Sequence, residues 1–519
     1  MKIKLLIIFV FLATVCNAQL QDLAKLANGK LIYSSLLYDA NDNIYGYLFI
    51  YQRDANKTTR KMEYVFLDKN LNKVSNNTFS SYTYEDYAEG KYYDCTLMGE
   101  NIILNKFYTY MPFLNNGVLL PLVSAFQMIN LKENTVSKEF KFEEGKFTEL
   151  PADWRKLRKD NRKEITKNTV VAFDNGSHSG FFVFQQNTAD KDYLEKDIKL
   201  FNENRELKWK YVYNPLGKPA QYFTFHFLYV KDNTIYGLQA RRNMTYASEY
   251  KIVALDFETG KKKYEYLLED LKSQYSHTLN VKEINGQLVL AGNFSTFNKK
   301  KEFELTDNLG FYRIVLDENG KEIEKKHVKW SAFSSKIDID ENGEVEKNFL
   351  LKPTRYLLFK DGSISIITEK YKPERKGVFI PLPIIGNLTS LATYSSEKTT
   401  DFVIFTMDTA FALQTINTIK KDLTKYNSSD YLFSQYIDDE SGAVFFYDNV
   451  VKGDKSKDKS VVLGITRIKN GEIVEERIPI FSKEKYSIDP FPAKEGYIML
   501  REYNEKDKYN QIRLEKINL

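Results

Sequence analysis

The sequence contains little cysteine, histidine or tryptophan. Its 519 residues include 2 cysteines, 4 histidines and 3 tryptophans. Only Cys95 remains if an N-terminal segment ending at Ala18 is removed, and one thiol excludes an internal disulfide. The fold must therefore be stabilised by a packed core, and a chain of about 500 residues is long enough to bury one.

Long apolar runs are also scarce after the N-terminus. The best candidate is "KGVFIPLPIIGNL", from Lys376 to Leu388, and Pro381, Pro383 and Gly386 interrupt it. A helix that crosses a membrane needs about 20 apolar residues in succession. We therefore expect no transmembrane span.

The N-terminus has the features of a secretory signal peptide. Lys2 and Lys4 precede an apolar run from Leu5 to Val15, and the small residue Ala18 follows. This order predicts a signal peptide over residues 1–18 with cleavage after Ala18. A lipidated Cys16 is the alternative, but Val15 is a poor match to the small residue that lipoprotein signals require. We expect an exported protein that is periplasmic, associated with the outer surface, or secreted.

The charge pattern argues against nucleic acid as a partner. The chain has 75 basic and 70 acidic residues and a net charge of +5. Proteins that bind nucleic acid usually concentrate basic residues on one face. Here the two signs are interleaved along the chain.

Short alternating runs of Tyr, Phe, Ile, Leu and Val, separated by tight turns, fill the chain and predict antiparallel strands. They recur as units of four strands about every 60 residues, which is typical of a β-propeller. We predict an all-β fold with one propeller domain over residues 19–519, with eight blades preferred and seven as the alternative. The approximate blades are residues 30–79, 91–142, 170–214, 222–269, 276–330, 354–422, 430–481 and 488–519.

Two segments do not fit the strand pattern. The last unit lacks one strand, and Gln19 to Gly29 has a helical leucine spacing that makes it a poor strand to complete that unit. Residues 153–167, "DWRKLRKDNRKEITK", predict a short basic helix between the second and third units. Trp154, Arg155 and Arg158 in it are candidates for contact with anionic lipid or glycan, and the alternative is a helix docked on a blade.

The chain resembles the large, uncharacterised propeller-like proteins secreted by Bacteroidota-type bacteria. The resemblance rests on the Asn-Ala-Gln cleavage site at residues 17–19 and on turns such as Leu316-Asp317-Glu318-Asn319-Gly320. A second such turn runs from Leu255 to Gly260. The resemblance implies export and a repeat fold, and it implies no catalytic residues.

The loops predict where binding would occur. Within each unit the first and third turns are tight, whereas the second loop is long, and function usually lies on variable loops. Two second loops are apolar and similar, since Gly117 to Leu122 repeats the pattern of Gly377 to Leu382. Exposed apolar patches often mark interaction sites, and the alternative is that both loops are buried packing. The candidate binding residues are Leu119, Leu120, Pro121, Val378, Phe379, Ile380 and Pro381.

Catalytic and metal motifs are weak. His178 in "DNGSHSG" is expected in a hairpin turn, and no two histidines have metal-ligand spacing. Asp338, Asp340 and Asn342 match the first half of a calcium loop, but Phe349 stands where a glutamate belongs. A polar turn is the other interpretation of this segment, and we predict no cofactor.

These observations favour a non-catalytic binding or scaffold protein of the bacterial cell envelope, with a protein, glycan or lipid surface as partner. The alternative is an envelope enzyme that acts on a glycan or peptide through two carboxylates at a fixed separation.

Overall fold

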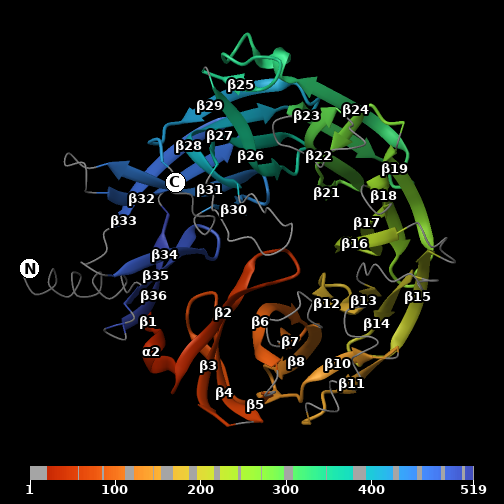
Figure 1. Cartoon of the computed structure of the whole chain (residues 1–519), viewed down its shortest axis with the longest axis vertical. Coiled ribbons are helices and arrows are strands. Elements are labelled where there is room, and N and C mark those ends of the chain that lie inside the picture. The colour runs from red at the N-terminus through yellow and green to blue at the C-terminus, as the bar shows by residue number, and fades with distance from the viewer. Residues whose placement is uncertain are drawn as a thin grey trace, which may run out of the picture. The chain divides into compact units, whose positions relative to one another are not determined.

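The computed structural model consists almost entirely of antiparallel strands in the residues that it describes (Figure 1). The described residues are 20–56, 58–83, 87–110, 122–143, 145–153, 168–185, 196–214, 222–242, 247–270, 272–296, 308–346, 348–377, 393–424, 432–452, 459–480, 486–504, 506 and 509–517. The chain divides into two compact units, the first made of Met1–Leu268 with Glu484–Ile517 and the second of Glu269–Lys483.

The first unit contains five sheets. One sheet is formed by β2 (Lys30–Tyr38), β3 (Ile44–Ala55), β4 (Thr59–Asp68) and β5 (Lys73–Tyr82). The next is formed by β6 (Tyr87–Met98), β7 (Asn101–Tyr110), β8 (Leu122–Asn130), β9 (Thr135–Val136), β10 (Phe140–Glu143) and β11 (Lys146–Glu149). A third has β12 (Asn168–Asp174), β13 (Ser179–Gln185), β14 (Lys196–Phe201) and β15 (Leu207–Asn214). A fourth has β16 (Tyr222–Lys231), β17 (Thr234–Arg242), β18 (Ala247–Asp256) and β19 (Lys262–Asp270). The fifth joins β1 (Leu20–Asp22) to β34 (Ser487–Pro492), β35 (Tyr497–Asn504) and β36 (Tyr509–Lys516).

The second unit contains three sheets. The first has β20 (Tyr275–His277), β21 (Asn280–Ile284), β22 (Gln287–Thr296), β23 (Asn308–Leu316) and β24 (Glu322–Lys329), followed by the short 3-10 helix η2 (Trp330–Phe333). The second has β25 (Glu344–Val345), β26 (Phe349–Leu358), β27 (Ile364–Gly377), β28 (Thr393–Met407) and β29 (Leu413–Ile419). The third has β30 (Phe433–Ile437), β31 (Gly442–Lys452), β32 (Lys459–Lys469) and β33 (Glu472–Ile480).

These eight sheets are the blades of an eight-bladed β-propeller fold, which confirms the predicted fold class and the preferred number of blades. Extra strands in three sheets are short. In the sheet of β6 to β11, β9 and β10 both pair with β8. In the sheet of β20 to β24, β20 and β21 both pair with β22. The extra strands are therefore small additions to a four-stranded antiparallel plan.

The expectation that Gln19 to Gly29 is a poor strand is wrong for its first residues. Leu20 pairs with Arg513 and Asp22 pairs with Gln511, so β1 is the fourth strand beside β36 (Figure 1). The helical spacing is also real, because the four-residue helix α2 (Leu23–Leu26) begins directly afterwards. Asp22 caps it by accepting a hydrogen bond from the amide of Ala24 at 3.1 Å.

The core lies between successive sheets of each unit. Along β27, Ile366 belongs to the buried cluster shared with the sheet of β20 to β24. Its neighbour Ile367 belongs to the cluster shared with the sheet of β30 to β33. Side chains of a strand alternate between the two faces of its sheet, so one strand contributes to two cores. Burial of both faces explains why the strands appear in the sequence as nearly continuous apolar runs.

Several structural features bear on the sequence predictions. "KGVFIPLPIIGNL" begins at the end of β27, and residues 378–392 lie between β27 and β28. Trp209 lies on β15, an outer strand of its sheet, and Trp330 begins η2. Across the described part of the chain, no helix is long and apolar enough to cross a membrane.

Candidate functional site

Several tight turns are closed by hydrogen bonds to their own side chains. In five of them an aspartate Oδ1 accepts the amides two and four residues later, at 2.8–3.0 Å. These aspartates are Asp39, Asp68, Asp317, Asp340 and Asp408. Such a contact replaces the backbone hydrogen bonds that a turn leaves unmade, so these carboxylates serve the turns themselves.

Asp340 belongs to the segment with the calcium-loop pattern. Its Oδ1 accepts the amides of Asn342 and Glu344, as its counterparts do in the other turns. Among the described residues, no group of three or more His, Cys, Asp or Glu side chains is arranged to hold a metal ion. The calcium site at Asp338, Asp340 and Asn342 stays a prediction.

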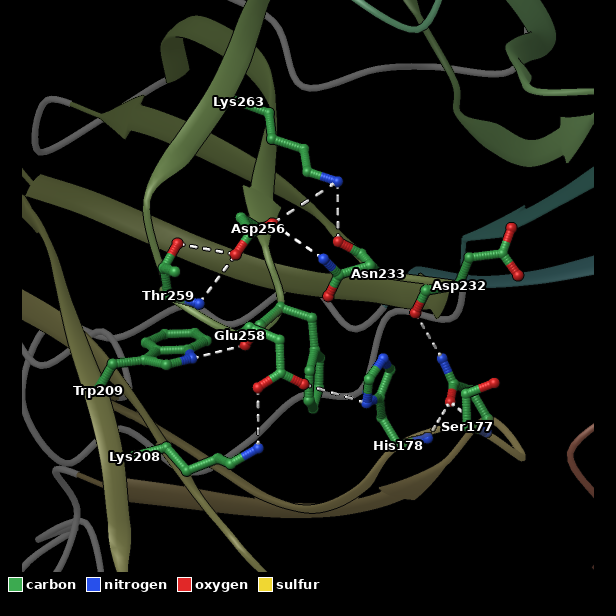
Figure 2. A network of polar contacts seen from close by, with 12 residues as sticks. Ser177, His178, Lys208, Trp209, Asp232, Asn233, Asp256, Glu258, Thr259 and Lys263 are labelled. Atoms are coloured by element: carbon green, nitrogen blue, oxygen red, sulfur yellow. Dashed lines mark hydrogen bonds and ion pairs between the residues drawn. The ribbon is translucent and has the colours of Figure 1, made fainter.

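The turn that contains His178 contacts the neighbouring sheet of the first unit, as Figure 2 shows. The His178 ring stacks on Phe257 with centroids 4.2 Å apart, and its Nδ1 lies 3.4 Å from Glu258 Oε1. Lys208 Nζ lies 3.4 Å from the other oxygen of Glu258. Trp209 donates from its indole nitrogen to the carbonyl of Phe257 at 2.7 Å. The predicted hairpin turn is confirmed, and its contacts join the turn ends of two sheets.

In the sheet of β25 to β29, the hairpin of β27 and β28 extends beyond the neighbouring strand β26. β27 and β28 pair from Ile364↔Met407 to Gly377↔Thr393. The pairing of β26 with β27 ends at Leu350↔Tyr371. Beyond this point β27 and β28 continue to pair for six more residues each, from Lys372↔Lys398 to Gly377↔Thr393. We call residues 372–377 and 393–398 the ribbon. At about 3.3 Å per residue the ribbon is roughly 20 Å long.

A buried ion pair lies where the ribbon leaves its sheet. Lys421, which follows β29, donates a short hydrogen bond from Nζ to Oε1 of Glu369 in β27. The ammonium also lies 4.5 Å from the centroid of the Phe402 ring. Glu369 is 1% exposed and Lys421 is 8% exposed. Taking both charges out of water is costly, so the pair must be held in good geometry.

Asp401 of β28 forms the second part of this cluster. Its Oδ2 lies 2.9 Å from Lys420 Nζ and 3.3 Å from Lys370 Nζ, and its Oδ1 accepts the Lys421 amide at 3.1 Å. Burial alone would raise the pKa of Asp401, but these hydrogen bonds and the nearby cations lower it overall. We call Glu369, Lys370, Asp401, Lys420 and Lys421 the ionic base of the hairpin.

An additional carboxylate of the adjacent sheet lies beside the ionic base. Asp448 of β31 is 4% exposed. Burial raises its pKa to about 6, with the nearby Lys421 opposing the shift and Glu369 adding to it. Its neighbour Asn449 accepts the amide of Asp422 at 3.2 Å, so this sheet also holds the segment after β29.

The first unit has a similar buried cluster on the strand that precedes its own apolar loop in the sequence. Residues 111–121 follow β7, and Lys106 of β7 lies 3.0 Å from Glu139 Oε1. Tyr108 donates a short hydrogen bond to Oε2 of Glu139, and Lys106 Nζ lies 2.6 Å from Tyr108 Oη. Burial lowers the pKa of Lys106, and Glu139 opposes this shift. Both strands that precede the similar apolar loops therefore contribute a residue to a buried ionic cluster, Glu369 from β27 and Lys106 from β7.

None of the ten predicted binding residues is among the described residues. Leu119, Leu120, Pro121, Val378, Phe379, Ile380, Pro381, Trp154, Arg155 and Arg158 lie outside the described residues, as does the predicted helix after Asp153. The ionic base was missed because Glu369 and Lys421 are 52 residues apart in a chain rich in both charges. His277 and His327 were also missed, although their Nε2 atoms lie 3.0 Å apart, because only tertiary structure brings them together.

Comparison with solved structures gives only distant similarity. The WD40 domain of SCAP from fission yeast is 8% identical, with a TM-score of 0.27 and coverage of 83% of this chain and 97% of that one. Prolyl oligopeptidase B from Galerina marginata is 6% identical, with a TM-score of 0.35 and coverage of 84% and 46%, so this chain spans less than half of it. The quinohemoprotein alcohol dehydrogenase ADHIIG from Pseudomonas putida HK5 is 10% identical, with a TM-score of 0.38 and coverage of 96% and 76%. The three include a WD40 domain and enzymes, and at these TM-scores they do not decide between binding and catalysis.

A comparison with curated proteins found no match. A family model described as "Family of unknown function (DUF6770)" matches residues 135–428. The matched region is more than half of the chain and includes the whole β27–β28 hairpin with its ionic base. The chain therefore belongs to this family, DUF6770.

Proposed function

We propose that this protein is a non-catalytic binding protein that holds its partner with the β27–β28 hairpin. The observation that carries the proposal is the ribbon, which continues six residue pairs beyond the strand that supports its sheet. A two-stranded hairpin is only marginally stable by itself in water. The ionic base lies where the ribbon leaves the sheet, and we expect its buried ion pair to stabilise the start of the ribbon.

The partner is expected to contact the apolar segment that the ribbon carries. The sequence between the two strands contains Val378, Phe379 and Ile380, and large apolar side chains at a loop are typical of interaction sites. The similar loop of residues 111–121 also follows a buried ionic cluster. Envelope protein, glycan and lipid surfaces all remain within this proposal, and the two loops are its predicted contact points.

An enzyme that acts on a glycan or peptide is the second candidate. Its support is the raised pKa of Asp448 beside a second carboxylate, that of Glu369, because a carboxyl group whose pKa is raised by burial can act as a general acid. However, Glu369 and Asp448 are 1% and 4% exposed, and Lys421 already binds Glu369. A substrate would have to displace packed residues to reach them, so we favour binding.

We further propose that the protein acts outside the cytoplasm, as the predicted signal peptide over residues 1–18 indicates. Mass spectrometry of the protein isolated from its own cells tests this location. Cleavage after Ala18 would give a chain that begins at Gln19. An intact chain in the cytoplasmic fraction would contradict the proposal.

A trimmed variant tests the binding role. In it an Asn-Gly turn joins Lys372 directly to Lys398, which removes five of the six pairs of the ribbon and leaves the ionic base. The matched control uses the same turn to join Lys452 to Lys459 in the adjacent sheet. Proteins captured by each chain from envelope extracts are quantified by mass spectrometry, and immobilised envelope glycan and lipid vesicles are probed in parallel.

We expect the full chain and the control to bind the same partner and the trimmed chain to lose it. Equal binding by all three chains would refute the proposal. Melting curves show whether the trimmed chain folds. A Phe379→Asp, Ile380→Asp variant keeps the ribbon and should lose the partner as well, which separates loss of contact from loss of fold.

A further inference from the structure

Two histidines of the second unit face each other across a distance that suits a shared ligand. His277 lies in β20 and His327 in β24, and their Nε2 atoms are 3.0 Å apart. The His277 side chain is 3% exposed, whereas His327 is half-buried and so keeps some contact with solvent. Neither residue belongs to the hairpin or to its ionic base.

A carboxylate fixes the orientation of the first ring. Glu269 Oε2 accepts the backbone amide of His277 at 3.0 Å and lies 3.3 Å from its Nδ1. A carboxylate beside Nδ1 favours the tautomer with the proton on Nδ1, which leaves Nε2, on the side that faces His327, with a lone pair for a ligand. Histidines that bind metal ions usually have such a carboxylate partner on the other nitrogen.

Aromatic rings surround the pair. The His277 ring meets Tyr312 edge-on with centroids 4.5 Å apart, and His327 meets Phe294 edge-on at 4.8 Å. Tyr275 lies 5.0 Å from His327. Tyr312 is itself fixed, since its hydroxyl donates to the carbonyl of Thr278 at 2.6 Å. These rings hold the two imidazoles in place, and solvent reaches the pair only on the side of the half-buried His327.

We propose that His277 and His327 bind one divalent transition-metal ion through their Nε2 atoms, with Glu269 orienting His277. Imidazole nitrogens bind such ions at about 2.0–2.1 Å, and a separation of 3.0 Å then gives an angle of about 90° between the two ligands. Cis ligands at this angle suit the tetragonal geometry of Cu²⁺ or Ni²⁺, with water completing the shell on the side of His327. A tetrahedral Zn²⁺ site would need the nitrogens to separate to about 3.3 Å.

Calorimetry with NiCl₂ tests the site in the full chain, purified without a polyhistidine tag and stripped with a chelator. We expect one Ni²⁺ per chain. His277→Ala and His327→Ala should abolish binding, and Glu269→Gln should weaken it about 10- to 100-fold. His178→Ala is the matched control, because His178 lies in a turn of the first unit, and it should bind as the wild type does.

Copper provides a second measurement that does not depend on affinity alone. The electron paramagnetic resonance spectrum of the Cu²⁺-loaded chain should show coupling to two imidazole nitrogens, and to one or none in the His327→Ala variant. Absence of Ni²⁺ binding by the wild type would overturn the proposal and leave a hydrogen-bonded histidine pair. Unchanged stoichiometry in both histidine variants would also overturn it. Circular dichroism establishes that each variant is folded.

Discussion

Lys421→Met is the substitution that tests the ionic base most sharply. The change leaves the Glu369 carboxylate without its cation, and it also removes the cation nearest to Asp448. Loss of one partner of a buried ion pair costs about 3–5 kcal/mol. Glu369→Met should cost less, because Lys421 then still has Asp448 nearby. The Glu369→Met, Lys421→Met double variant should be close to the wild type, since apolar replacements of a buried pair are often neutral.

Hydrogen exchange is the suitable assay, because a chain of this size need not unfold in a single step. Peptides that cover β27, from Ile364 to Gly377, report local opening of the hairpin. We expect the largest loss of protection in Lys421→Met, a smaller loss in Glu369→Met, and recovery in the double variant. Equal loss in both single variants, or a double variant worse than Lys421→Met, would refute the reasoning.

Three further substitutions test other parts of the structure. Burial raises the pKa of Asp448 to about 6, so the unfolded chain loses this proton first and the fold loses stability as the pH rises from about 4 to 6. Asp448→Asn should therefore match the wild type near pH 4 and exceed its stability at pH 8 by at most about 3 kcal/mol, which denaturant titrations at the two pH values measure. Gly260 has a φ of +66°, and a Cβ there would lie 2.5 Å from the Trp209 ring, so Gly260→Ala should lower the melting temperature by an amount equivalent to about 1–3 kcal/mol. Asp317→Ala removes a side chain that accepts two turn amides, and we expect it to cost about 1 kcal/mol in the same melting assay, with no change if the turn closes without it.

The fold could be predicted from the sequence because the propeller repeats one simple pattern. Inner strands alternate side chains between two cores, as β27 does with Ile366 and Ile367, and many tight turns carry an aspartate or a glycine. Both signals are local, and each recurs in several of the eight sheets. The three-residue strand β1 was not predicted, because it pairs with β36 near the other end of the chain and no local pattern indicates such a pairing.

The candidate site was only partly predictable. The two apolar loops could be recognised from their similar sequences, and the strand bounds place one of them beyond the ribbon. The ionic base could not be recognised, because Glu369 and Lys421 become partners only when β27 and the segment after β29 come together in the folded sheet. The same holds for His277 and His327, which are 50 residues apart and are brought together by β20 and β24.

Site-specific photo-crosslinking in the producing cells tests the central claim most directly. A photoreactive residue replaces Arg375 in the ribbon, and a control replaces Asn319 in a tight turn of the same unit. The binding role of the hairpin predicts one crosslinked product from position 375 that is absent at position 319, and it predicts loss of that product when Phe379 is changed to Asp. Crosslinking at position 319 alone, or the same product from both positions, would contradict the account.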